Sequence, residues 1–335
     1  MVKSGTDRAV RYITDRPVLA VLCGKDRPSA MATVESAATV RYTGPDGLAG
    51  ALDGADALFV WDFLSDAVAG SWSGAGSVGW VHIASAGVDK LLFPGIVDGE
   101  VTLTNSRGVF DGAIAEYVLA VILAFAKDLP HSLRLQGQRC WLHRESERIE
   151  GQRALIVGTG PIGAAVARLL RAAGMRVAGV GRRARAGDPD FGTVHSSDEL
   201  LSHLPCADFV VAVAPLTEQT KGMFGREAFV AMRDSARLIN VGRGALVATG
   251  ALIDALDSGQ IAGAALDVFE TEPLQPNSPL WAMPNVQVSP HMSGDFQGWK
   301  DALAELFVGN FERWIAGERL HNVVDKSLGY VPSVN

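Results

Sequence analysis

Residues 153–163, RALIVGTGPIG, limit the possible folds of this chain more than any other stretch. They include an apolar, β-prone run at 154–157 without polar alternation, which is typical of a strand buried on both faces. A G-x-G-x-x-G sequence follows, and residues 164–173 then have the apolar spacing of a helix that ends at Gly174. A strand, a glycine turn and a helix in this order predict a dinucleotide-binding unit.

Each glycine of this turn has its own steric reason. Gly158 would make the turn, Gly160 would let the backbone approach a pyrophosphate, and Gly163 would let the helix pack closely on the strand. The pyrophosphate would lie at the helix N-terminus, where N–H groups and the helix dipole favour an anion. An ordinary turn without a ligand is the alternative. We predict that six consecutive residues contact the cofactor: Gly158, Thr159, Gly160, Pro161, Ile162 and Gly163.

Short apolar runs alternate with helix-like segments along most of the chain, which indicates parallel α/β sheets. Before the turn, strands are expected at 17–23, 57–61, 80–84 and 101–104; after it, at 176–180, 207–214, 237–241, 262–268 and 286–289. We predict a Rossmann-type doubly wound parallel sheet inserted into a second, flavodoxin-like α/β substrate domain. The dinucleotide-binding domain would be 107–290, and the substrate domain 1–106 plus 291–335. A last helix, 299–316, would pack back on the substrate domain.

Composition excludes several other classes of function. A net charge of −7 argues against binding to nucleic acid or to anionic membranes. Three scattered cysteines are too few for a disulfide framework, so we expect a reducing, cytoplasmic location. The polar N-terminus has no signal-peptide core, and no apolar run reaches the roughly 18 residues of a membrane helix. We predict no metal site, because five histidines outside the motifs show no metal-ligand spacing and are interpreted as surface or structural residues: His131, His143, His195, His203 and His321.

Arginines occupy the end of the strand at 176–180, where an NAD site usually carries a carboxylate. That carboxylate belongs to an Asp or Glu about 20 residues after the glycine turn, and it binds the ribose 2′-OH. Here the sequence is GVGRRAR, and Asp188 falls well into the loop. Arginine can pair with a 2′-phosphate, which a carboxylate would repel. We therefore predict Arg182 and Arg183 as cofactor ligands and NADP(H) as the preferred cofactor, with NAD(H) also accepted; the alternative is a solvated basic loop that tolerates either.

Three polar segments, NVGRG, DVFETEP and SPHMSG, follow successive strands of the predicted sheet. In a doubly wound fold, the carboxyl ends of parallel strands carry the ligand contacts. Arg243, Glu272 and His291 could therefore converge near a nicotinamide. Each residue alone also fits an ordinary role as a cap, a turn residue or a structural residue. Their joint placement beside a dinucleotide turn favours a catalytic site.

At these residues the sequence resembles a known family, the D-isomer-specific 2-hydroxyacid dehydrogenases. The matching segments follow the family order and run from about residue 80 to residue 294. The arginine-containing cofactor loop is similar to that of glyoxylate/hydroxypyruvate reductases within the family. The segments that carry the resemblance are ASAGVD (84–89), TNSRGVFDGAIAE (104–116), GTGPIG (158–163), APLTEQTKGM (214–223), INVGRGALV (239–247), ALDVFETEPL (265–274) and SPHMSG (289–294).

The resemblance implies a role for each of the three polar residues. Arg243 would bind the carboxylate of a 2-oxoacid and polarise its ketone, as a planar cation with forked donors does well. His291 would be the general acid in reduction and the base in oxidation. Glu272 would hold the imidazole and favour its protonated form.

The resemblance also implies further contacts with substrate and cofactor. The backbone N–H groups of one loop would hold the substrate carboxylate: Ser85, Ala86, Gly87 and Val88. Pro215 and Thr220 would line the adenosine and phosphate side, whereas Asp267 and the Val241 carbonyl would face the nicotinamide. Asn105 and Gly108 would lie at the hinge between the domains.

Together these predictions describe an NADPH-dependent reductase of small 2-oxoacids such as glyoxylate or hydroxypyruvate. Formate and phosphonate dehydrogenases share the scaffold, and a dinucleotide-sensing corepressor is an alternative from a different class. The nearly all-apolar helix expected at 111–126 is either a subunit interface or an internal core helix. We expect a homodimer through the cofactor domain, and no nucleic-acid or membrane partner.

Overall fold

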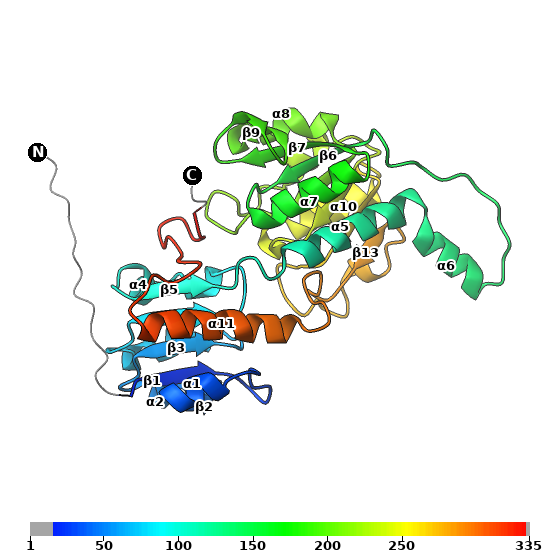
Figure 1. Cartoon of the computed structure of the whole chain (residues 1–335). Helices are drawn as coiled ribbons and strands as arrows, with labels where there is room; N and C mark the ends of the chain where they lie inside the picture. The colour runs from blue at the N-terminus through cyan, green and yellow to red at the C-terminus, as the bar shows by residue number, and fades with distance from the viewer. Residues whose placement is uncertain (1–15, 333–335) are drawn as a thin grey trace, which may run out of the picture. The chain divides into compact units, whose positions relative to one another are not determined.

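The computed structural model describes residues 16–332, which form two compact units (Figure 1). Unit 1 contains the chain up to Val109 and from Gln297 onward, and unit 2 is Phe110–Phe296. This division falls a few residues after the predicted boundaries at 106/107 and 290/291, and the assignment of a function to each domain stays a prediction. Within residues 16–332, no helix is both long and apolar enough to cross a membrane.

Unit 1 is built on a five-stranded parallel sheet in the order β2-β1-β3-β4-β5, which is the flavodoxin-like strand order. Strand β2 was not predicted, because Arg41 interrupts its apolar pattern. The strands are β1 (Val18–Leu22), β2 (Thr39–Thr43), β3 (Ala57–Val60), β4 (Trp80–Ile83) and β5 (Thr102–Asn105). The helices are α1 (Ala32–Ala37), α2 (Leu48–Leu52), α3 (Ala67–Ser71), α4 (Pro94–Val97) and α11 (Trp299–Ile315).

Helix α11 returns to cover the sheet of unit 1. Its Phe307 is fully buried and stacks on Phe59 of β3, with ring centroids 3.8 Å apart and planes 3° apart. The same ring stacks on Trp80 of β4 at 5.4 Å. Such aromatic pairs contribute beyond their buried area, so the last helix is an integral part of this core.

Unit 2 is built on an eight-stranded sheet in the order β13-β12-β11-β10-β6-β7-β9-β8, parallel except for β8. This confirms the predicted α/β class and doubly wound sheet. The strands are β6 (Arg153–Val157), β7 (Arg176–Gly181), β8 (Arg185–Asp188), β9 (Gly192–Ser196), β10 (Phe209–Ala212), β11 (Arg237–Asn240), β12 (Gly263–Leu266) and β13 (Val286–Val288).

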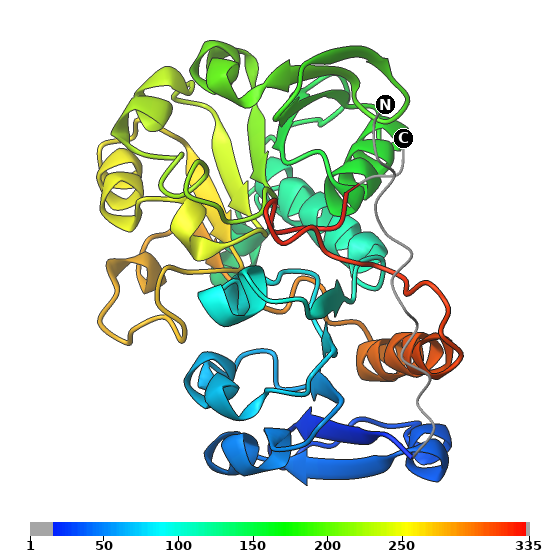
Figure 2. The same ribbon diagram turned by 90° about the vertical axis from the view of Figure 1, so that its left-hand side faces the viewer.

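Helices cover both faces of this sheet (Figures 1 and 2). On one face α5 packs against α7, and on the other α9 packs against both α8 and α10. The helices are α5 (Asp111–Ala126), α6 (Leu129–Gly137), α7 (Pro161–Ala172), α8 (Leu200–His203), α9 (Arg226–Ala231) and α10 (Thr249–Asp257). The β8–β9 hairpin replaces the loop that was expected around Asp188.

Candidate active site

The parallel strands of unit 2 end side by side at one edge of the sheet. The loops that carry the predicted site residues begin at these strand ends. The paired residues Val157, Ala212, Asn240, Leu266 and Val288 are in register across β6, β10, β11, β12 and β13. The chain beyond each strand end therefore leaves the sheet at the same edge. Gly158 and the loops that carry Arg243, Glu272 and His291 all begin there.

The glycines of the turn after β6 differ in what surrounds them. A Cβ at Gly158 would lie 2.5 Å from the Ala214 nitrogen, and one at Gly163 would lie 2.0 Å from the Gly158 oxygen. Both positions therefore require glycine for close backbone packing, and Gly158 also has a φ of +118°. Nothing lies within 4 Å of a Cβ at Gly160, so that glycine leaves open space in front of the turn.

Helix α7 begins directly after this open space. Gly160 is its N-cap, and Pro161 is at its first turn, where the missing N–H costs no helical bond. The N–H groups of the first turn and the helix dipole suit an anion such as a pyrophosphate. A Cβ on Gly181 of β7 would lie 2.6 Å from the Thr159 hydroxyl, so the turn packs against the neighbouring strand as well. These features fit a dinucleotide.

The loop after β11 holds Arg243 through its backbone. The Asn240 side chain accepts a hydrogen bond from the Gly242 N–H (3.2 Å) and donates one to the Arg243 carbonyl (3.0 Å). A Cβ on Gly244 would lie 1.8 Å from the Phe269 carbonyl carbon, so this loop packs directly on the loop after β12. Only glycine permits that approach. The guanidinium also donates to the Gly242 carbonyl (2.9 Å).

Glu272 and His291 form a hydrogen-bonded pair. His291 Nδ1 lies 2.8 Å from Glu272 Oε2, and the other carboxylate oxygen accepts a bond from the Phe269 N–H at 2.9 Å. The side chains are 39% and 32% exposed, so the pair is accessible without being fully solvated. This arrangement leaves Nε2 as the ring nitrogen that can face a substrate.

The carboxyl of Glu272 is held in its charged form. Burial by itself raises the pKa of Glu272. The hydrogen bonds from His291 and the Phe269 N–H, together with nearby positive charge that includes Arg243, outweigh burial and bring the pKa below its ordinary value. Arg243 is thus close enough to act electrostatically on this pair. The structure brings the three predicted residues into one region of unit 2.

A buried carboxylate organises the loop that carries His291. Asp267 is 0% exposed, and its oxygens accept bonds from the N–H groups of Met292 and Ser293, both at 2.9 Å. The Ser289 hydroxyl also donates to this carboxylate (2.5 Å). His291 itself has a φ of +52°, a conformation that is strained for a residue with a side chain. Asp267 thereby holds the backbone after the strained histidine and the Ser289 side chain before it.

Sequence reasoning missed a second part of this support. The Tyr117 hydroxyl of α5 lies 2.6 Å from the Ser289 hydroxyl. Because Ser289 donates its proton to Asp267, Tyr117 is the donor to Ser289. Burial raises the pKa of Tyr117, which keeps the phenol protonated for that bond. Tyr117 directly follows the matched segment TNSRGVFDGAIAE (104–116), yet nothing local to it points to residue 289.

The loop between β7 and β8 carries the two predicted arginines. Arg182 and Arg183 are both exposed. The carboxylate of Asp188 is engaged elsewhere, because it accepts bonds from Arg185 Nε (2.6 Å) and from the N–H groups of Asp190 and Phe191 (3.0 Å each). The Asp188 carboxylate is therefore bonded within its own hairpin and the segment that follows it.

The remaining predicted residues lie in two places. In unit 2, the Thr220 hydroxyl donates to the Pro215 carbonyl at 2.7 Å, and Val241 is buried directly after β11. In unit 1, the Ser85 hydroxyl donates to the Gly87 carbonyl at 2.6 Å, and Asn105 donates to the Ala86 carbonyl at 2.5 Å. Val88 of that loop is buried. Contacts of all these residues with substrate or cofactor stay predictions.

Comparison with known proteins gives a consistent result. The family model described as "D-isomer specific 2-hydroxyacid dehydrogenase, NAD binding domain" matches residues 119–293. A glyoxylate reductase from Aeropyrum pernix is 34% identical over 238 residues, which cover 68% of this chain and 70% of the relative. One from Thermococcus litoralis is 32% identical over 254 residues, covering 73% and 76%.

Solved structures resemble nearly the whole chain. A D-isomer-specific 2-hydroxyacid dehydrogenase from Xanthobacter autotrophicus Py2, in complex with NADPH and MES, has a TM-score of 0.81 and 31% identity, and covers 94% of this chain and 100% of its own. An NADPH-dependent glyoxylate/hydroxypyruvate reductase from Sinorhizobium meliloti, in complex with NADP and sulfate, has a TM-score of 0.79 and 29% identity, with the same coverage.

Proposed function

The chain belongs to the D-isomer-specific 2-hydroxyacid dehydrogenases, a family of NAD(P)-dependent oxidoreductases, and on this premise we propose that it reduces small 2-oxoacids to D-2-hydroxyacids with NADPH. The observation that carries the proposal is the Glu272–His291 pair, 2.8 Å apart, at the sheet edge that also carries Arg243 and the glycine turn. NADPH bound at that turn supplies the hydride.

The three residues divide the remaining chemistry between them. The forked guanidinium of Arg243 binds the oxoacid and draws electron density from its ketone. Protonated His291 gives its Nε2 proton to the carbonyl oxygen as the alkoxide develops. Glu272 accepts the hydrogen bond from Nδ1–H, which fixes the orientation of the ring and stabilises its positive charge. In the oxidation direction His291 takes the proton back.

We propose glyoxylate or hydroxypyruvate as the substrate class, with the carboxylate held by the N–H groups of Ser85, Ala86, Gly87 and Val88. The named activities of the Aeropyrum and Sinorhizobium relatives support this choice. The test is a panel in which NADPH consumption is followed with glyoxylate, hydroxypyruvate, pyruvate and phenylpyruvate. NADP+ reduction with formate and with phosphite is followed in parallel. Cofactor binding without turnover of any oxoacid would favour a dinucleotide sensor instead.

We further propose that Arg182 and Arg183 select NADP(H). Changing both to Ala is expected to lower kcat/KM for NADPH by about 10- to 100-fold, because charged hydrogen bonds of roughly 1.5–3 kcal/mol are lost. The value for NADH should change little, because NADH has no 2′-phosphate. The ratio of the two kcat/KM values measures the effect. Arg226→Ala, at an exposed arginine on α9, is the matched control and should leave the ratio unchanged. A parent enzyme that prefers NADH would contradict the proposal.

We infer a homodimer that forms through unit 2. Helix α6 and the segment after it expose several large apolar side chains, including Leu133 (68% exposed) and Trp141 (99% exposed). Exposed apolar surface of this kind marks interfaces. The Leu133→Glu/Trp141→Arg double variant is expected to halve the molar mass measured by light scattering. Trp281→Arg, at a tryptophan that is 54% exposed in the same unit, should leave the dimer intact. A monomeric parent would refute the inference.

A cytoplasmic location is also part of the proposal. All three cysteines have free thiols, and Cys140 and Cys206 are exposed. Exposed thiols persist in a reducing compartment. The net charge of −7 argues against nucleic acid as a partner, and a small anionic substrate would be attracted by the local charge of Arg243.

A further inference from the structure

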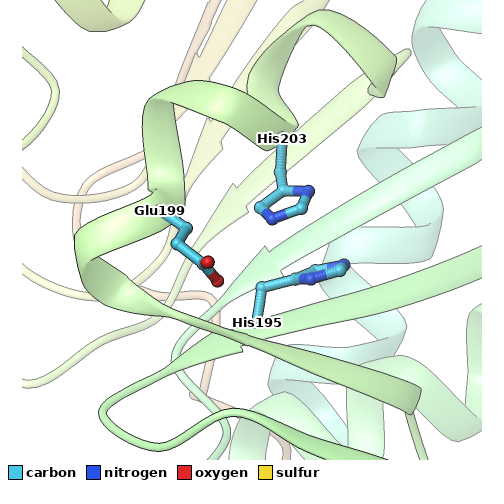
Figure 3. A group of neighbouring side chains, drawn as sticks. All are labelled: His195, Glu199 and His203. Carbon is cyan, nitrogen blue, oxygen red and sulfur yellow. The ribbon is translucent and has the colours of Figure 1, made fainter.

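Three side chains of metal-ligand type converge on unit 2, outside the residues of the proposed reaction (Figure 3). His195 is on β9, Glu199 ends the 3-10 turn Ser197–Glu199, and His203 ends α8. One ligand atom from each lies within 4.8 Å of the others. Figure 3 shows the carboxylate and the two rings gathered around one point.

The spacing of His195 and His203 in the sequence, which was interpreted as that of surface or structural residues, did not indicate this convergence. The residues are four apart in sequence. Glu199 and His203 are on the same side of a helical turn because of that spacing. β9 ends at Ser196, and the chain turns at once into the helical segment, which brings His195 to the same place. The sharp turn after the strand was not visible in the spacing.

The donor atoms of the three side chains suit a metal ion. The rings of His195 and His203 stack with centroids 3.5 Å apart and planes 21° apart. Imidazole nitrogens are common ligands of transition-metal ions, and the stacking brings two imidazoles together. Exposed Glu199 adds an anionic oxygen.

We propose that His195, Glu199 and His203 form a binding site for a divalent transition-metal ion such as Zn2+. Two imidazoles and one carboxylate are a donor set that zinc accepts, with water as the fourth ligand, whereas Ca2+ and Mg2+ prefer oxygen alone. Zinc ligands at about 2.0–2.2 Å from the ion lie roughly 3.3 Å from one another. All three side chains are partly or fully exposed, so modest rotation closes the group around the ion and leaves access for water.

A metal ion at this site would affect the structure around the loop that begins at Arg182. Strand β9 pairs with β7, with His195 opposite Val180 and Ser196 opposite Gly181. The loop that begins at Arg182 follows directly. A bound ion would join β9 to α8 beside that loop and stabilise this edge of the sheet. The site does not depend on the proposed reaction.

The test is titration of the full, chelator-treated chain with ZnCl2 by calorimetry and with CoCl2 by visible absorption. We expect one ion per chain at this site. His195→Ala, His203→Ala and Glu199→Gln should each weaken binding by roughly tenfold or more, given that even outer-shell changes cost 10- to 100-fold in metal sites. Zn2+ should also raise the Tm of the parent but not of His195→Ala/His203→Ala. Circular dichroism verifies that each variant is folded, and Glu199→Gln changes only an exposed side chain.

Matched controls separate this site from others in the chain. His131 lies 3.0 Å from Asp128, and His291 lies 2.8 Å from Glu272, so each could offer a competing His–carboxylate pair. Cys206 is an exposed thiol three residues after His203. His131→Ala, His291→Ala and Cys206→Ala should leave the first equivalent of binding unchanged, and the Co2+ spectrum should lack a thiolate charge-transfer band. Equal affinity in the parent and in both His195→Ala and His203→Ala would overturn the proposal, as would no binding by the parent.

Discussion

The His291→Ala variant is expected to lose about 10²- to 10⁴-fold in kcat for oxoacid reduction, while its affinity for NADPH stays almost unchanged. The imidazole is the proposed proton donor to the developing alkoxide, and water donates less effectively because it is not positioned. The pyrophosphate turn is formed by other residues, from Gly158 to Gly163, so cofactor binding does not need this side chain. Single-turnover kinetics and a fluorescence titration with NADPH measure the two quantities.

A control variant and the support of the loop define this test. His143→Ala removes an exposed histidine of the same unit and should leave kcat unchanged. The loop around His291 is held by Asp267 through backbone N–H groups, so the loss of the imidazole should not unfold it. Turnover of His291→Ala at the parent rate would exclude His291 as the acid.

The Glu272→Gln variant distinguishes orientation from proton transfer. The lowered pKa of Glu272 means that this carboxyl is anionic throughout the neutral range. Glutamine can still accept the hydrogen bond from Nδ1–H, but it carries no negative charge beside the imidazole, so kcat should fall at neutral pH. In the parent, kcat should fall in the acid range, where the Glu272 carboxylate takes up a proton, and the Glu272→Gln variant should lack this acid limb. A pH–rate profile identical to that of the parent would show that Glu272 does not act through His291.

The second large effect is expected at Arg243. Arg243→Ala should lower kcat/KM for the oxoacid by roughly 30- to 5,000-fold, which corresponds to the 2–5 kcal/mol lost when one partner of a desolvated charge pair is truncated. The loop should keep its shape, because the Asn240 side chain and the contact of Gly244 with Phe269 hold it through backbone atoms. NADPH affinity should therefore change little.

Arg243→Lys gives the matched comparison. Lysine keeps the positive charge but lacks the planar fork that can bind a carboxylate with two parallel bonds. An intermediate loss in kcat/KM would assign part of the effect to charge and part to geometry. Arg233→Ala removes an arginine that pairs with Asp208 at 2.8 Å elsewhere in unit 2, and it should leave kcat/KM unchanged. If Arg243→Ala had the kcat/KM of the parent, oxoacid binding by Arg243 would be excluded.

The sequence predicted those parts of the fold that depend on local pattern. The apolar run at 154–157, the glycine turn and the following helix appear as β6, the turn and α7, because each is specified by neighbouring residues. Parallel strands then place Arg243, Glu272 and His291 at one edge without any knowledge of side-chain contacts. Strand order and direction therefore predict which loops share an edge of the sheet, but not which side chains contact each other.

Contacts between distant segments could not be predicted in this way. The bond between Tyr117 and Ser289 joins α5 to the loop between β13 and His291, across 172 residues of sequence. The convergence of His195 with His203 depends on backbone angles at one sharp turn. The β8–β9 hairpin is built from RAGD and GTVHS, which lack the apolar alternation that would mark strands. In each case tertiary packing outweighs local propensity.

The return of α11 to the sheet of unit 1 has a consequence for synthesis on the ribosome. All five strands of that sheet have been made by Asn105, but the helix whose Phe307 covers Phe59 and Trp80 begins only at Trp299. At about 5–20 residues per second, this delay lasts roughly 10–40 s. The whole of unit 2 emerges during that interval as one continuous segment and can complete its core first. The aromatic face of the earlier sheet therefore stays uncovered during translation, and nascent chains are most open to chaperones and to aggregation at that face.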